Sequence, residues 1–157
     1  MKRWIILLTL LLAALRAQAQ TTELEQLLIR HGAGDGVTSI FFERTMMQMM
    51  SLQAARQGDR ELARLLDEIR FIRVIASRTT TRPADETEQL VRSGRQFRLI
   101  AEANLDGQQT RIYLRTWRSH ENKELVVITR EHGEQTVVHL YGAFDLHDVS
   151  RLSSIRP

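Results

Sequence analysis

Residues 97–141 alternate between apolar and polar side chains, and this pattern constrains the fold more than any other feature of the 157-residue chain. Alternation with a period of two is typical of strands whose two faces meet different surroundings. The turn-forming dipeptides Asp106-Gly107 and His132-Gly133 divide the segment, and polar residues 119–122 divide it again. The segment is therefore predicted to form an antiparallel meander of four strands.

Hairpin geometry predicts the register of this meander. A two-residue loop at Asp106-Gly107 pairs Ala101 with Ile112 and Leu99 with Leu114. The other expected pairs are Leu114–Val127 and Thr116–Leu125 at the second turn, and Val127–Val138 and Leu125–Leu140 at the third. These pairs place one apolar set on a single face, which we expect to be the core face: Phe97, Leu99, Ala101, Ile112, Leu114, Leu125, Val127, Val138 and Leu140.

The residues before the meander alternate between helical and strand patterns. Helices are expected over 22–30, over 43–57, after an N-cap at Asp59, and from Pro83 to Gly94. Strands are expected over 37–42 and 69–77, and the second of these is apolar on both faces. A last helix is expected after Asp145, with Leu146, Val149 and Leu152 as its apolar stripe. We predict one α+β domain over residues 20–157, in which one or two N-terminal strands extend the C-terminal meander and the helices pack on one face.

The first nineteen residues have the pattern of an export signal. A short basic start is followed by an apolar run over residues 5–15, and Ala17-Gln18-Ala19 offers the small-x-small pattern that signal peptidase recognises. A membrane anchor is the alternative, but the apolar run is about half the length that a spanning helix needs. We therefore expect cleavage after Ala19, export to the periplasm or the medium, and no transmembrane segment in the mature chain.

Charge and cysteine content restrict the partners of the mature chain. Three of the 22 basic residues lie in residues 1–16, which contain no acid, so that 19 basic residues remain against 19 acidic ones. A chain without net charge lacks the electrostatic attraction that drives nucleic-acid binding, and we expect none. Since the chain has no cysteine, neither a disulfide framework nor a cysteine-linked lipid anchor is expected.

The second face of the predicted meander mixes aromatic, arginine and aliphatic residues. Such a face is too apolar for a solvated surface, and tyrosine, tryptophan and arginine are enriched at the centres of protein interfaces. Either a helix or the C-terminus covers its apolar middle while arginines rim it, or the face binds a protein in the cell envelope or a second copy of the chain. The candidate partner-binding residues are Tyr113, Arg115, Trp117, His139 and Tyr141.

The sequence contains few candidates for catalytic or metal-binding residues. It contains no nucleophile elbow, zincin motif or recognisable carboxylate pair, so that we expect no catalytic site and no cofactor. The alternative is a small metal-dependent or hydrolytic enzyme with a site near His120 and His147, where Glu121, Asp145 and Asp148 are also expected. The methionines at 46, 47, 49 and 50 could form an adaptable binding groove, although core filling is favoured.

Several segments together resemble a known family. They are Gly36-Val37-Thr38-Ser39-Ile40 before the helix with Met46–Met50, the strand over 69–75, and the ending over 140–149. With the export signal they are similar to the family of domain of unknown function 4252, small exported bacterial proteins, over roughly residues 24–155. The resemblance implies no activity, cofactor or catalytic residue. It implies an envelope or stress setting, because some members are encoded beside envelope-stress sigma factors. Many members look lipid-anchored through a cysteine, which this chain lacks.

Taken together, these features predict an exported, non-enzymatic binding or interaction protein.

Overall fold

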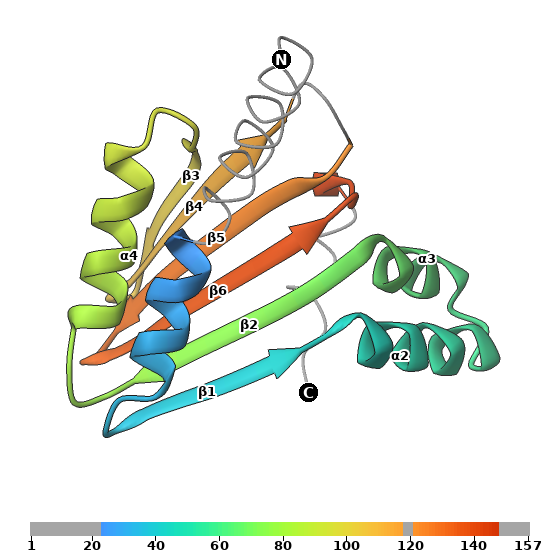
Figure 1. The fold of residues 1–157 in the computed structure, drawn as a ribbon, viewed down its shortest axis with the longest axis horizontal. Coiled ribbons are helices and arrows are strands. Elements are labelled where there is room, and N and C mark those ends of the chain that lie inside the picture. The colour runs from blue at the N-terminus through green and yellow to red at the C-terminus, as the bar shows by residue number, and fades with distance from the viewer. Residues whose placement is uncertain (1–22, 118–120, 148–157) are drawn as a thin grey trace, which may run out of the picture.

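An antiparallel sheet of six strands forms the frame of the domain in a computed structural model that describes residues 23–117 and 121–147. The strand order is β1-β2-β6-β5-β4-β3 (Figure 1). The predicted α+β class and the C-terminal meander are confirmed, and both N-terminal strands extend the meander as expected. The strands are β1 (Val37–Phe42), β2 (Ile69–Ser77), β3 (Arg98–Leu105), β4 (Gln108–Thr116), β5 (Lys123–Glu131) and β6 (Glu134–Gly142).

Four helices accompany the sheet in the described part of the chain. One spans residues 23–32, and the others are α2 (Arg44–Arg56), α3 (Arg60–Glu68) and α4 (Arg82–Ser93). Asp59 caps α3 as predicted, because its Oδ1 accepts the backbone N–H of Leu62 at 3.0 Å. A further helix starts at Leu146, but Val149 and Leu152 of its expected stripe lie outside the described residues, as does the leader.

The helices pack on both faces of the sheet, whereas we expected them on one. On the first face, which we call the α4 face, the helix over 23–32 and α4 cover a row of side chains, and both lie on the same side of the strands in Figure 1. On the second face, the α2–α3 face, the α2–α3 hairpin packs on Leu114, Leu125 and Leu140 together with Phe144. Alternate residues of the central strands therefore face different helices. The core of the α4 face consists of Tyr113, Val126, Ile128, Val137 and Ile75 against Leu24, Leu28, Ala84 and Val91.

Both two-residue turns are confirmed. Leu105 pairs with Gln108 and Glu131 with Glu134, and the turn residues have positive φ, 49° at Asp106 and 83° at Gly107, 45° at His132 and 84° at Gly133. Positive φ at both positions is the type I′ geometry, which matches the twist of the paired strands. The pairs Ala101–Ile112, Val127–Val138 and Leu125–Leu140 follow as predicted.

Two predicted registers are wrong. Leu114 pairs with Leu125 and Thr116 with Lys123, two residues from the expected pairs, because the loop before β5 is longer than we assumed. A shift of two residues keeps every side chain on its face. A register shift between Leu99 and Ala101 places Leu99 opposite Tyr113 instead of Leu114. Leu99 thereby leaves the predicted core face, and Phe97 packs with the core of the α4 face.

The methionines of α2 divide between the core and the surface. Met47 is buried, which agrees with core filling, but 46 % of Met46, 66 % of Met49 and 42 % of Met50 are exposed. Core filling is thus wrong for three of the four methionines, and α2 presents an apolar outer surface.

Candidate functional site

The five predicted partner-binding residues lie together on the α4 face, and helices cover most of them. Tyr113, Arg115 and His139 are buried within the domain, with exposed fractions of 3 %, 4 % and 0 %. Trp117 and Tyr141 are half-buried, and their rings meet edge to face with centroids 5.8 Å apart. The first of the two alternatives for this face therefore holds in the domain: its apolar middle is covered. The partner-binding role of these residues stays a prediction, and in this conformation a partner could reach only Trp117 and Tyr141.

A buried charged cluster occupies one end of this face. Glu124 on β5 forms an ion pair with Arg115 of β4, and its other oxygen lies 2.6 Å from Nε2 of His139 on β6. All three side chains are almost completely excluded from solvent. Arg115 also donates to Oε1 of Gln96 at 2.7 Å. Because a buried charge is costly unless it is paired and hydrogen-bonded, Glu124 is what allows an arginine to lie here.

Aromatic rings surround Arg115 and His139. The guanidinium carbon of Arg115 lies 4.9 Å from the ring centroid of Phe97 and 4.5 Å from that of Trp117. Phe71 packs edge to face on His139 with centroids 5.1 Å apart. Ring faces attract cations, and the attraction is stronger away from water. These contacts explain the mixture of aromatic and arginine residues that suggested an interface in the sequence.

A carboxylate-bound imidazole is also the arrangement of a general base. Nδ1 of His139 is buried without a hydrogen-bond partner, but the side chain is fully enclosed, so that a substrate cannot reach it in this conformation. We therefore interpret the Arg115–Glu124–His139 cluster as structural. The signal missed in the sequence was Glu124, because the predicted register placed Val126 opposite Arg115.

A second cluster anchors α4 to the sheet. Glu88 of α4 accepts from Arg111 at 2.6 Å, from the hydroxyl of Tyr113 at 2.8 Å and from Arg130 at 2.8 Å. Burial by itself would raise the pKa of Glu88, but these hydrogen bonds outweigh it and hold the pKa below its ordinary value of 4.5. Burial, followed by the hydrogen bond to Glu88, raises the pKa of Tyr113 to about 12. The two-residue turn at Asp106-Gly107 also places Glu102 opposite Arg111, and these side chains form an ion pair at 2.9 Å.

The alternative metal site falls partly outside the described residues, where His120 and Asp148 lie. Within the described part, no group of three His, Asp or Glu side chains could hold a metal ion. Oδ1 of Asp145 accepts the backbone N–H of His147 at 2.9 Å, which is the contact of a helix cap.

The outer half of the α2–α3 face keeps half-buried and exposed aliphatic side chains in the described part of the chain. Beyond the leucine row under α2–α3, a middle row of half-buried or exposed aliphatic residues crosses the strands: Ile40, Val74, Val138, Val127, Ile112 and Ala101. A threonine row follows with Thr38, Thr136, Thr129 and Thr110, the last two with hydroxyl oxygens 3.3 Å apart. We call these two rows the open sheet face.

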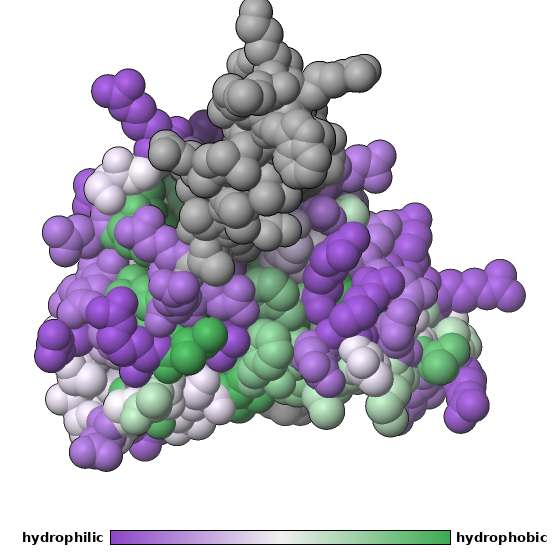
Figure 2. All heavy atoms as spheres, in the orientation of Figure 1, coloured by the Kyte–Doolittle hydropathy of each residue, from purple (hydrophilic) through white to green (hydrophobic). Residues whose placement is uncertain are grey.

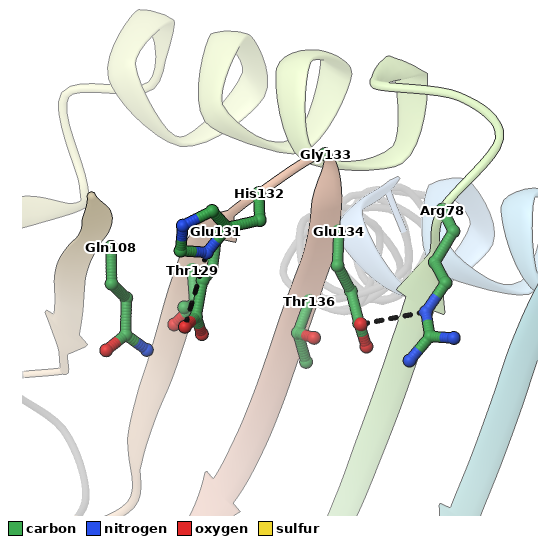
Figure 3. Close-up of a pocket in the computed structure, with 8 residues that line it drawn as sticks. All are labelled: Arg78, Gln108, Thr129, Glu131, His132, Gly133, Glu134 and Thr136. Atoms are coloured by element: carbon green, nitrogen blue, oxygen red, sulfur yellow. Dashed lines mark hydrogen bonds and ion pairs between the residues drawn. The ribbon is translucent and has the colours of Figure 1, made fainter. Parts of the chain in front are cut away.

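A hollow of about 690 Å³ lies at the outer end of this face. In Figure 3, Arg78 and Glu134 point toward one another with Thr136 beside them, and His132 lies over Glu131. Arg78 Nε lies 2.9 Å from Glu134 Oε2, and His132 Nδ1 lies 3.6 Å from Glu131 Oε1. The hollow is therefore lined by charges of both signs and by the threonine row, and the aliphatic middle row lies next to that row.

Comparison with known proteins identifies the family. A family model described as a domain of unknown function (DUF4252) matches residues 32–152, and the chain therefore belongs to this family. No curated protein matches the chain. Within the described residues, no helix is long and apolar enough to cross a membrane.

Proposed function

We propose that the chain is an exported, non-enzymatic interaction protein whose open sheet face binds an amphipathic helix of a protein partner in the cell envelope. The observation that carries the proposal is the middle row of this face, whose aliphatic side chains are left half-buried or exposed. Aliphatic rows on a sheet are ordinarily covered by another layer of structure.

The other side of the same sheet indicates what kind of layer fits. There, two helices of about three turns each cover the neighbouring rows that contain Val126 and Val137. They contribute small and branched residues to that core, among them Leu28, Ala84 and Val91. The middle row of the open sheet face is built from the same residue types on the same strands. A helix with one apolar stripe therefore suits it by shape and by hydrophobicity.

The rim supports a helix with a charged outer surface. Arg78 and Glu134 lie at one side of the hollow, and Glu131 also lines it. Charges of both signs at the edge of an apolar patch favour a partner that carries charges beside its apolar stripe. Such charges determine the orientation of the bound partner more than they raise its affinity.

Export is the second part of the proposal and rests on residues 1–19. Their basic start, short apolar run and Ala17-Gln18-Ala19 ending have the form of a cleavable leader. The envelope is accordingly the compartment in which a partner is sought, and the family resemblance to exported proteins supports the same choice.

Site-specific photo-cross-linking in the native envelope tests the proposal. A photoreactive amino acid replaces Thr129 on the open sheet face, and the matched control carries it at Gln89, an exposed position of α4. We expect Thr129 to cross-link an envelope protein within a segment of helical apolar periodicity. We also expect a synthetic peptide of that segment to bind the wild-type chain and to lose at least about tenfold in affinity for Val127→Asp.

Three results would overturn the proposal. A cross-link from Thr129 only to residues 148–157 of the same chain would mean that this face is covered from within. The same partner captured equally from Gln89 would mean that the contact is not specific to this face. No cross-linked partner at all would leave the face without the function assigned to it.

A further inference from the structure

The outer edge of β1 is open in the described part of the chain. β1 is the first strand in the sheet order and pairs with β2 alone over residues 23–117 and 121–147. Its four central residues are exposed, including 44 % of Ile40 on the α2–α3 face and 44 % of Phe41 on the α4 face. A free strand edge presents unpaired backbone N–H and C=O groups, which can pair with a further strand.

The two edges of the sheet differ in how they are protected against such pairing. The opposite edge strand, β3, has an irregular register between Leu99 and Ala101 and carries the charges of Arg98 and Glu102. Bulges and charges are the usual means by which proteins prevent strands from pairing at an edge. β1 has the sequence VTSIFF, without a charge or a proline, and it pairs with β2 without a register shift. The contrast singles out β1 as an edge that is suited to pairing.

An apolar surface continues from this edge onto α2. Only Glu43 separates β1 from the helix, and α2 lies at the β1 side of the α2–α3 hairpin (Figure 1). Ser51 on the inner side of α2 donates to the carbonyl of Ala63 in α3, so that the opposite side of the helix faces outward. Figure 2 shows green and white residues along the lower margin, where β1 runs, and at the lower right, where α2 lies. The exposed apolar residues of α2 are Met46, Met49, Met50 and Leu52.

From this edge we infer that the chain forms a twofold dimer in which the β1 strands of two copies pair antiparallel. A twofold axis perpendicular to the sheet at Ile40 places that residue opposite Ile40 of the second copy. It also places Thr38 opposite the second copy's Phe42, and Ser39 opposite its Phe41. Each pair joins residues of the same sheet face, and cross-strand pairs of aromatic and β-branched residues are favourable. No like charges meet anywhere along the strand.

A second copy suits this edge better than a strand of another protein. The strand is its own complement, since it is uncharged, regular and bounded by the same apolar helix in both copies. Closed twofold pairing is the commonest symmetry of protein assemblies, and it uses up the edge of both chains without leaving one free to grow. The methionines of α2 add adaptable apolar area to the backbone hydrogen bonds of the strands. This dimer forms through the backbone edge of β1, whereas the proposed partner helix lies across the strands on the open sheet face. Ile40 and Thr38 belong to both surfaces, but dimerisation of the purified chain is measured without the partner and neither requires nor excludes the function proposed above.

The test compares charge insertions at the two edges of the sheet. The full chain is expressed with its own leader, purified as the host processes it, and studied by sedimentation velocity over a range of concentrations. Ile40→Lys places two ammonium groups face to face at the twofold axis, and Leu105→Lys introduces the same charge on β3, where Leu105 is 69 % exposed. We expect a wild-type dimer, a dissociation constant raised at least about tenfold by Ile40→Lys, and an unchanged dimer for Leu105→Lys.

Amide hydrogen exchange provides a readout that does not depend on the size of the particle. Amides of residues 37–42 should become more protected as the wild-type concentration rises, and this dependence should vanish in Ile40→Lys. If Ile40→Lys does not fold, Thr38→Lys, also at an exposed position of β1, replaces it. A wild-type chain that is monomeric at every concentration would overturn the inference. So would a dimer that survives the β1 charge, or an assembly that grows without limit.

Discussion

Two glutamates hold the buried charge of the α4 face, and each does so in a different setting. Glu124 is fully buried between Arg115 and His139, whereas Glu88 reaches from α4 to two arginines and a tyrosine at the sheet surface. Removal of one partner from a buried pair leaves the other charge without compensation. Substitution of either glutamate is therefore expected to lower the stability of the domain.

Truncation of Glu124 should destabilise the domain strongly. Glu124→Ala leaves the buried guanidinium of Arg115 without its anion, and we expect a loss of about 3–5 kcal/mol in the free energy of unfolding. The matched control is Glu134→Ala, which removes an exposed pair with Arg78 and should cost at most about 1 kcal/mol. Urea unfolding followed by circular dichroism measures both. Equal losses in the two variants would contradict the structural role assigned to the buried cluster.

The contribution of Glu88 should depend on pH in a definite direction. Because its folded pKa lies below the ordinary value of 4.5, its stabilising effect is complete above about that pH and is lost as the pH falls through the folded pKa. Glu88→Gln should cost about 1–3 kcal/mol near neutral pH, and the difference from wild type should shrink in acid. Urea unfolding of both proteins at a series of pH values measures this difference. A difference that stays constant down to the acid transition would contradict the assignment.

For single residues, the sequence predicted the sheet face of a side chain better than the residue that the side chain contacts. Alternation placed Arg115 and His139 on one face, and the pairing of Glu102 with Arg111 followed from a turn of known length. The partner of Arg115 depended on the loop before β5, where an error of two residues moved Glu124 away from it. Period two fixes the face of a residue, whereas only the loop length fixes its neighbour.

Among the elements, the join between α3 and β2 packs closely against the end of β6. Gly142 at the end of β6 lies so close to this join that an added Cβ would be 2.2 Å from the carbonyl oxygen of Glu68 and 2.8 Å from Cα of Ile69. The backbone N–H of Ala143 donates to the same carbonyl at 2.9 Å. The helical hairpin is thereby held at the end of the strand by its backbone as well as by the leucine row.

Gly142→Ala should accordingly be among the more damaging small substitutions. The methyl group meets backbone atoms that cannot rotate away, and we expect a loss of roughly 2 kcal/mol or more. Gly94→Ala is the control, because its added Cβ meets only the carbonyl of Leu90 at an ordinary 3.5 Å and its φ is −77°. Thermal and urea unfolding distinguish the two. A Gly142→Ala variant as stable as Gly94→Ala would mean that β6 moves freely away from α3.

Elements bounded by local signals were predictable, and their tertiary neighbours were not. The cap at Asp59, the end of α4 at Gly94 and both two-residue turns depend on a few adjacent residues, and all of them are confirmed. The bulge in β3 carries no such signal, since Leu99 and Ile100 are both apolar and either register places one apolar residue on each face.

For the molecule as a whole, the question left by the sequence was which apolar surfaces are covered. α4 is mainly polar, with the sequence RPADETEQLVRS, yet its Ala84 and Val91 help the helix over 23–32 to cover the face around Tyr113. The α2–α3 face and the β1 edge keep exposed apolar residues although their sequences are no less suited to burial. Coverage depends on where connecting segments lead each helix, and residue patterns within one element do not contain that information.

Removal of the leader should change the charge of the molecule measurably. The full sequence has a pI of about 9.9 and a net charge of +3, while residues 20–157 carry 19 basic and 19 acidic residues. We therefore expect the exported protein to focus near neutrality and to have an intact mass that begins at Gln20. The control is the variant Ala17→Tyr with Ala19→Tyr, which removes the small residues that the peptidase reads and should keep the basic pI and all 157 residues. The uncleaved wild-type chain would have a mass of 18.2 kDa. Wild-type protein that retains this mass and focuses with the variant would contradict cleavage, and with it the export on which the proposed function depends.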